Sequence, residues 1–210
     1  MKKLQKTNWV RKMIVGVCTC LMTVLLAGCS LSGLADHIGD LFGNKTGKEL
    51  DGLTYQLSAD GTYYTLVDCE KGVSVADIVA EIDGVPVTTI AGDTFFNNRS
   101  ALTKINIPDS VTTLEDDCIS QCYYIRDIVI PDSVTYIGKN AFYHCRAMRS
   151  ITIGAGVETI GDYAFYICDD LQTVNYRGSA AEWDEIQIGA GNEDLTELQR
   201  NYVAKTSSAE

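Results

Sequence analysis

The chain has 210 residues, a formal net charge of −11 and a hydrophobic content of 46%, enough for one domain with an apolar core. Its three prolines exclude a proline-rich or low-complexity chain. The first 28 residues carry five basic and no acidic side chains, so the remainder carries −16 and repels phosphate backbones. We therefore expect no nucleic-acid partner.

Residues 1–28 are predicted to be an export signal. The basic start "MKKLQKTNWVRK" precedes an apolar run from 13 to 27, which as a helix would be about 22 Å long, short of the roughly 30 Å hydrocarbon layer. A basic start, a short apolar middle and small residues at the end are typical of a secretory signal. This element predicts an exported protein.

The sequence "LAGC" at 26–29 resembles the lipobox of bacterial lipoproteins. The resemblance implies cleavage before Cys29 and attachment of lipid to its thiol. The mature protein would then be held through that lipid at the outer face of the bacterial cell membrane or at the cell surface. In the alternative, an ordinary secretory signal, Cys29 is incidental.

Residues 29–50 are expected to form a tether behind the lipid. Apolar residues recur there at helical spacing, but Gly33, Gly39 and Gly43 each disfavour a helix. A flexible spacer and a short interfacial helix are both compatible with this pattern.

Residues 51–87 are expected to form an N-terminal cap. The stretch "LTYQLSADGTYYTLV" alternates apolar and polar residues around Asp60-Gly61, which predicts a β-hairpin. Val75, Ile78 and Ile82 are expected to help this hairpin cover the first coil of the domain.

Residues 88–178 repeat with a period of 23, and internal periods of this size indicate a solenoid. Apolar residues stay in phase while the positions between them vary. The columns are Leu102, Ile125, Met148 and Leu171; Ile105, Ile128, Ile151 and Val174; Ile107, Ile130, Ile153 and Tyr176; Phe96, Ile119, Phe142 and Phe165; Val111, Val134 and Val157; and Leu114, Ile137 and Ile160.

Each row is predicted to form one coil of a β-rich solenoid. Alternate apolar residues make a short strand, and Pro108 or Pro131 ends it because proline has no N–H to donate. A second extended piece, such as "VTYI", returns on the other side. A single coil cannot bury its apolar face, whereas stacked coils turn each column into a continuous ladder in the core.

The repeat "IVIPDSVTYIGKNAFYHC" resembles the BspA-type leucine-rich repeats of bacterial surface proteins, as does "VETIGDYAFYIC". The resemblance covers about residues 50–200 and implies a short leucine-rich repeat stack of 23-residue coils. In that architecture the residues beside the central strand isoleucine point outward on a concave sheet, where such proteins bind partners. Those candidate binding residues are Lys104, Asn106, Asp127, Val129, Ser150, Thr152, Thr173 and Asn175, and an ordinary solvated sheet is the alternative.

Residues 179–203 are expected to form a C-terminal helix and strand cap, followed by a loose tail at 204–210. Ser179 and Glu182 have the spacing of a capping box that opens a short helix. Trp183, Ile186 and Ile188 are expected to seal the last coil.

Catalytic and metal chemistry are not expected. Cys122, Cys145 and Cys168 follow the repeat period, which favours packed thiols; disulfides, including one between Cys118 and Cys122, are the alternative. The spacing of the cysteines does not match a metal site, so no metal or cofactor is predicted. His144 adjoins Cys145, but neighbours on a turn usually point apart, so a nucleophile pair is not expected.

These observations together predict a non-catalytic cell-surface lipoprotein whose repeats bind a protein, a glycan or another macromolecule. A structural spacer or assembly component of the cell envelope, without a specific ligand, is the alternative hypothesis.

Overall fold

The computed structural model describes residues 47–203. The predicted signal at 1–28, the predicted lipidation site Cys29, residues 29–46 of the predicted tether and the tail at 204–210 lie outside the described residues. Within 47–203, no helix is long and apolar enough to cross a membrane.

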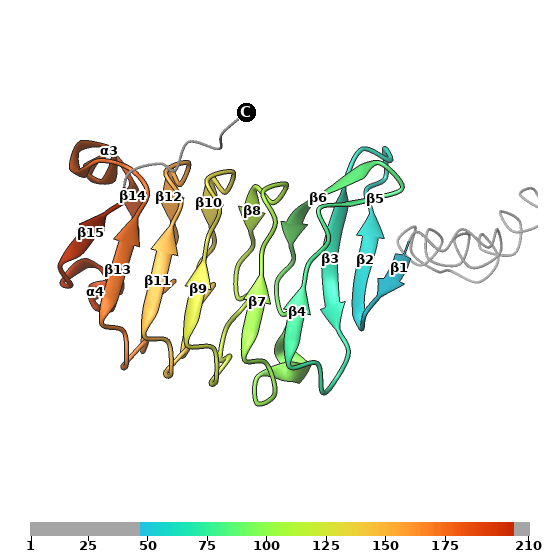
Figure 1. The fold of residues 1–210 in the computed structure, drawn as a ribbon, viewed down its shortest axis with the longest axis horizontal. Coiled ribbons are helices and arrows are strands. Elements are labelled where there is room, and N and C mark those ends of the chain that lie inside the picture. The colour runs from blue at the N-terminus through green and yellow to red at the C-terminus, as the bar shows by residue number, and fades with distance from the viewer. Residues whose placement is uncertain (1–46, 204–210) are drawn as a thin grey trace, which may run out of the picture. The chain divides into compact units, whose positions relative to one another are not determined.

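The described residues form a β-solenoid in which the chain alternates between two faces (Figure 1). One sheet contains, in spatial order, β1 (Gly47–Leu50), β2 (Leu53–Leu57), β3 (Tyr64–Cys69), β6 (Val85–Ile90), β8 (Thr113–Leu114), β10 (Tyr136–Ile137), β12 (Thr159–Ile160) and β14 (Gln187–Ile188), and β5 (Glu81–Ile82) pairs with β6. The opposite strands are β4 (Val75–Asp77) paired with β7 (Lys104–Asn106), and a sheet of β9 (Asp127–Val129), β11 (Ser150–Ile153), β13 (Thr173–Tyr176) and β15 (Arg200–Tyr202). Short helices are η1 (Phe96–Asn98), α3 (Ala180–Asp184) and α4 (Glu193–Thr196).

Within the repeats, β8, β10 and β12 pair in parallel at an offset of 23 residues, and so do β9, β11 and β13. Ile151 of β11 lies beside Ile128 of β9 on one side and Val174 of β13 on the other. All three side chains are buried, with at most 2% of their surface exposed. Residues 23 apart are therefore spatial neighbours, which confirms the predicted leucine-rich repeat stack.

The predicted column that begins with Phe96 is wrong at its first member. Phe96 is 53% exposed and lies under the guanidinium of Arg99, whereas Phe95 is 1% exposed and occupies the core position. The reason is one extra residue in the first row, since Ile90 of β6 pairs with Leu114 of β8 although the two are 24 apart. Core positions upstream of the extra residue shift by one.

The N-terminal cap contains the predicted hairpin, since β2 and β3 pair in antiparallel fashion. β1 also pairs with β2, so the sheet already begins at Gly47, inside the predicted tether. Val75 is 44% exposed, contrary to expectation, because alternation along β4 buries Ala76 instead. Ile78 and Ile82 are buried as predicted.

The C-terminal cap adds a further coil to the stack. The Ser179 hydroxyl accepts from the Glu182 N–H and the Glu182 carboxylate accepts from the Ser179 N–H, which confirms the capping box at the start of α3. Trp183 and Ile186 are buried, and β14 continues the long sheet because Ile188 pairs with Ile160.

Two buried asparagines tie the turns of the repeats to the caps. Asn98 Nδ2 donates to the carbonyls of Cys69 (2.9 Å) and Glu70 (2.6 Å). At the other end, Asn192 Nδ2 donates to Gly189 (2.8 Å) and its Oδ1 accepts from the N–H of Phe165 (2.9 Å). Each amide satisfies backbone groups that the end of the stack would otherwise leave unpaired.

Candidate binding surface

The candidate residues share one surface, here called the strand face: the outward side chains of β7, β9, β11 and β13. Alternation along each strand buries the central apolar residue and turns its two neighbours outward. Lys104, Asn106, Asp127 and Val129 are exposed, and Ser150, Thr152, Thr173 and Asn175 are half-buried. The structure thus brings all eight predicted residues to one surface, four coils wide.

One row of the strand face is largely a polar ladder. Asn175 Nδ2 approaches Thr152 Oγ1 at 3.5 Å, and Asn201 Nδ2 donates to Asn175 Oδ1 at 3.2 Å. Val129 lies beside Thr152 in register and is 47% exposed. The row therefore carries one exposed apolar side chain among hydrogen-bonding groups.

A hollow of about 450 Å³ lies where β7 and β9 begin. Lys104 and Asp127 belong both to this hollow and to the strand face. The lining residues are Thr103, Lys104, Tyr124, Arg126, Asp127 and Ala147. This hollow, here called the strand-start hollow, offers two cations, one carboxylate and an aromatic ring.

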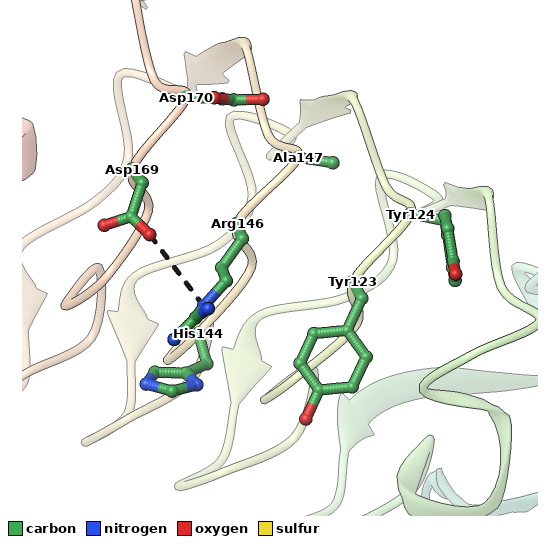
Figure 2. A pocket seen from close by; sticks show the side chains of 7 residues that line it. All are labelled: Tyr123, Tyr124, His144, Arg146, Ala147, Asp169 and Asp170. Carbon is green, nitrogen blue, oxygen red and sulfur yellow. Dashed lines mark ion pairs between the residues drawn. The ribbon is translucent and has the colours of Figure 1, made fainter.

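A second hollow of about 590 Å³ adjoins the first through the shared residues Tyr124 and Ala147. Its lining residues are Tyr123, Tyr124, His144, Arg146, Ala147, Asp169 and Asp170, which Figure 2 shows on successive turns of the solenoid. Arg146 Nε lies 3.8 Å from Asp169 Oδ2. Here called the acidic hollow, it carries two carboxylates and one paired cation.

The histidine of the acidic hollow is held by an aromatic neighbour. The rings of His144 and Tyr143 stack with centroids 4.5 Å apart, and Tyr143 in turn stacks on Tyr166 at 5.9 Å. Partial burial and, next, the charge of Arg146 lower the pKa of His144 from its ordinary value of 6.5. The imidazole is therefore largely neutral at pH 7.

Tyr124, Arg126 and the acidic hollow were missed by sequence reasoning. The column just before the buried Leu102, Ile125 and Met148 contains Ala101, Tyr124 and Ala147. Tyr124 thus stands between two alanines in neighbouring coils and is 55% exposed. A bulky aromatic flanked by small residues at the repeat interval was the signal that could have revealed the hollow.

The cysteines of the repeats are buried and free, as the packed-thiol interpretation predicted. Cys145 Sγ donates to the Ile119 carbonyl (3.3 Å) and Cys168 Sγ to the Phe142 carbonyl (3.4 Å), each in the preceding coil. Burial raises the pKa of Cys145 to about 12 and that of Cys69 to about 11. Thiols with such pKa values are not nucleophilic at neutral pH.

The described residues contain no group of three or more His, Cys, Asp or Glu side chains placed to hold a metal ion. Cys145 points into the core, whereas His144 lines the acidic hollow. The surface assembled here consists of an extended sheet and two open hollows. Such a surface is suited to recognition of a partner.

A stack of parallel coils with an in-register apolar core and a variable outer face defines a repeat solenoid. Comparison with known families identifies its class: six copies of the BspA type leucine rich repeat region match residues 84–187. Residues 84–187 are therefore BspA-type leucine-rich repeats. A search of curated proteins gave no match.

Two solved structures illustrate the fold. A leucine-rich repeat protein of T. pallidum is 19% identical with a TM-score of 0.51, over 68% of this chain and 81% of that one. A leucine-rich repeat protein from Eubacterium ventriosum is 22% identical with a TM-score of 0.50, over 65% of this chain and 39% of that one. Both similarities concern the fold alone.

Proposed function

We propose that this protein is a lipid-anchored, cell-surface recognition protein that binds a protein or another macromolecule through its strand face and has no catalytic activity. The observation that carries this proposal is the strand face itself, in which β9, β11 and β13 pair in register and β7 adjoins β9, so that eight side chains from four successive coils point outward. Extended sheet faces of this kind are the usual binding surfaces of repeat solenoids.

The charge distribution favours the strand face over the rest of the surface. Residues 47–203 include 25 acidic and 10 basic side chains, a net charge of −15. Among the eight strand-face residues only Lys104 and Asp127 are charged, and they carry opposite signs. Because the cores of protein interfaces are depleted in charged residues, a nearly neutral face with the exposed Val129 near its centre suits a partner better than the acidic remainder.

A charge-insertion experiment tests the proposal. The full chain and the double variant Val129→Lys/Thr152→Lys are compared for binding to a panel of immobilised extracellular proteins and glycans by surface plasmon resonance. A matched control, Thr135→Lys, places a lysine at an exposed position beside β10 in the opposite sheet. We expect at least one binding partner whose affinity falls about tenfold or more in the double variant and is unchanged in the control.

A different result would support the alternative hypothesis. If no partner on the panel binds, and the protein isolated from cells carries only envelope neighbours, a structural spacer explains the fold better. If a partner binds but tolerates both lysines, the binding surface lies outside the strand face.

The proposed location rests on the lipobox-like sequence at 26–29. Mass spectrometry of the mature N-terminus is expected to show a lipid-modified Cys29 as the first residue. A Cys29→Ala variant is expected to lose membrane association. An unmodified N-terminus elsewhere would contradict the lipid anchor and leave the proposed binding surface untouched.

The absence of catalysis is part of the proposal and is tested separately. The purified chain is screened for hydrolysis of mixed peptide and glycan substrates, with the buried thiols as the reason to expect none. Turnover that persists after repurification and disappears in a His144→Ala variant would contradict the proposal.

A further inference from the structure

We infer that the strand-start hollow binds the carboxylated terminal sugar of a glycan, with the following neutral sugars lying over the acidic hollow. The inference deepens the proposed function and rests on it, because Lys104 and Asp127 belong both to the hollow and to the strand face. It names the chemical class of one partner and the residues that recognise it.

The first observation is a local concentration of free cations on an acidic molecule. Four of the ten basic residues within 47–203 form ion pairs, and Arg200 lies against Trp183. Three of the other five lie at the starts of β7, β9 and β11, namely Lys104, Arg126 and Arg149. Arg126 and Arg149 are 23 residues apart, and the Arg149 N–H donates a hydrogen bond to the Arg126 carbonyl (2.7 Å), so the two arginines occupy equivalent positions in neighbouring coils. These cations therefore attract an anionic group to the strand-start hollow, although residues 47–203 carry a net charge of −15.

The second observation is the exposed ring of Tyr124. Among the described residues, Tyr143 stacks on His144 and on Tyr166, and Tyr163 meets Tyr166 edge to face, whereas Tyr124 has no aromatic partner. Its neighbours in the adjacent coils, Ala101 and Ala147, leave the ring accessible. An amphipathic ring with an accessible face and a polar hydroxyl suits the C–H face of a sugar, which is apolar, and its hydroxyl rim, which is polar.

The third observation distinguishes a glycan from a polyanion. The acidic hollow begins at Tyr124 and Ala147 and continues to Asp169 and Asp170. Arg146 pairs with only one of these carboxylates, Asp169, so the acidic hollow keeps a net negative charge that repels a second anion. Its carboxylates can also accept hydrogen bonds from sugar hydroxyls. A ligand with one carboxylate at one end and neutral hydroxylated rings behind it therefore matches the strand-start hollow and the adjoining acidic hollow, of which Figure 2 shows the second. An acidic peptide, a nucleic acid or a polyuronate would place repeated charge against Asp169 and Asp170.

The roles of the residues follow from this placement. Arg126 presents a planar fork of donors that matches a carboxylate, and Lys104 adds a second positive charge. Tyr124 packs against the sugar ring, and Asp127 and Thr103 form hydrogen bonds with the sugar hydroxyls. The strand-start hollow, at about 450 Å³, lies within the ordinary size range of small-ligand sites.

Calorimetric titration of the full chain tests the inference with two carboxylated sources, sialyllactose and a trisaccharide capped by glucuronic acid. Lactose is the neutral counterpart, and tetragalacturonate and a poly-glutamate peptide are the polyanionic probes. We expect at least one capped trisaccharide to bind about tenfold or more tightly than lactose and than either polyanion. Whichever trisaccharide binds identifies the source of the carboxylate.

Variants assign the binding to the hollow. Tyr124→Ala and Arg126→Ala are each expected to weaken the trisaccharide about tenfold or more, and Arg126→Lys to weaken it less. Tyr63→Ala and Lys139→Ala remove an exposed tyrosine and a free cation elsewhere and are expected to leave affinity unchanged. Circular dichroism verifies that each variant is folded.

Binding of neither trisaccharide, tighter binding of a polyanion, or binding that survives both alanine variants would overturn the inference. Its failure is distinguishable from failure of the proposed function. Val129 lines neither hollow, so a macromolecular partner that depends on Val129 in the absence of sugar binding would leave the proposed function standing. Sugar binding without any such partner would leave only the inference.

Discussion

The rings of Phe142 and Phe165 stack in the core with centroids 5.0 Å apart and an interplanar angle of 12°. The two residues are 23 apart in sequence and occupy the same place in successive coils. The Phe142 N–H donates to the Ala164 carbonyl (2.8 Å), so the backbone follows the same register as the rings. This pair shows how the repeat period becomes a continuous core ladder.

Replacing Phe142 with alanine is expected to lower the free energy of unfolding by about 4 kcal/mol, because it opens a cavity in a position that is 1% exposed. Phe96→Ala is the matched control, since that ring is exposed and contacts Arg99; its cost is expected to stay below about 1 kcal/mol. Urea unfolding of both variants gives the comparison. Similar losses at the two positions would contradict the corrected register of the first coil.

The buried Asn192 is expected to contribute strongly to the C-terminal cap. Asn192→Ala leaves the Phe165 N–H and the Gly189 carbonyl without their partner, at a position that is 2% exposed. We expect a loss of about 3 kcal/mol in unfolding free energy, measured by urea titration. Asn201→Ala, at an exposed position, is expected to change it by less than about 0.5 kcal/mol. Equal effects would show that the cap does not depend on the buried amide.

The backbone at Ile167 is strained, and an engineered asparagine is expected to relieve it. Ile167 has a φ of 58°, a left-handed conformation that is unfavourable for a β-branched residue by about 1–2 kcal/mol. Gln121 and His144 adopt the same conformation in the preceding coils, at φ values of 59° and 61°. Asparagine buries less apolar surface than isoleucine, so the net stabilisation expected for Ile167→Asn is about 1 kcal/mol.

Thermal and urea unfolding measure this gain. Gln172→Asn is the control, because Gln172 is exposed and does not have a positive φ, and it is expected to change stability by less than about 0.5 kcal/mol. If Ile167→Asn destabilises the protein more than the control does, the packing of the Ile167 side chain contributes more to stability than its left-handed backbone costs.

The buried thiols make the free energy of unfolding depend on pH in the alkaline range. Burial raises the pKa of Cys145 from its ordinary value of 9.0 to about 12, so the folded state keeps the proton at pH values where the unfolded state releases it. The stabilisation from the protonated thiol is complete below pH 9 and is lost as the pH rises towards 12. In that interval one thiol lowers the unfolding free energy by up to about 1.4 kcal/mol per pH unit.

Urea unfolding of the parent and of Cys145→Ala, under reducing conditions at several pH values from 7 to 10, measures this dependence. The difference between the two proteins is expected to be constant up to pH 9 and to change above it, with the parent losing stability more steeply. Parallel pH profiles would show that Cys145 does not titrate as a buried thiol.

The repeat period, the strand face and the core columns could be predicted because apolar residues of stacked coils must lie in phase. Ile128, Ile151 and Val174 follow from that requirement alone. The first row was predicted less well, because Phe95 and Phe96 are adjacent and equally apolar, and only the pairing of Ile90 with Leu114 decides between them.

Other features depend on contacts that have no local signature. Asn98 and Asn192 are buried because backbone carbonyls of the caps surround them, and sequence patterns treat asparagine as a turn or surface residue. The strand-start hollow arises where Tyr124 stands beside Ala147 of the next coil. Its recognition required the three-dimensional register together with side-chain volumes.

The neighbour relationship across the strand face can be measured with an engineered pair of histidines at Thr152 and Asn175, which lie in register on β11 and β13. Adjacent strands are about 4.8 Å apart, so both imidazoles can bind one Ni²⁺, whereas Val129→His/Asn175→His places them two strands apart, at about 10 Å. Unfolding is measured with Ni²⁺ and with a chelator for both pairs and the parent. We expect Ni²⁺ to stabilise Thr152→His/Asn175→His by about 2.7 kcal/mol at 100 times its dissociation constant, and the other two proteins far less. Equal responses of the two pairs, or none from the adjacent pair, would contradict the stacking of coils at 23-residue intervals.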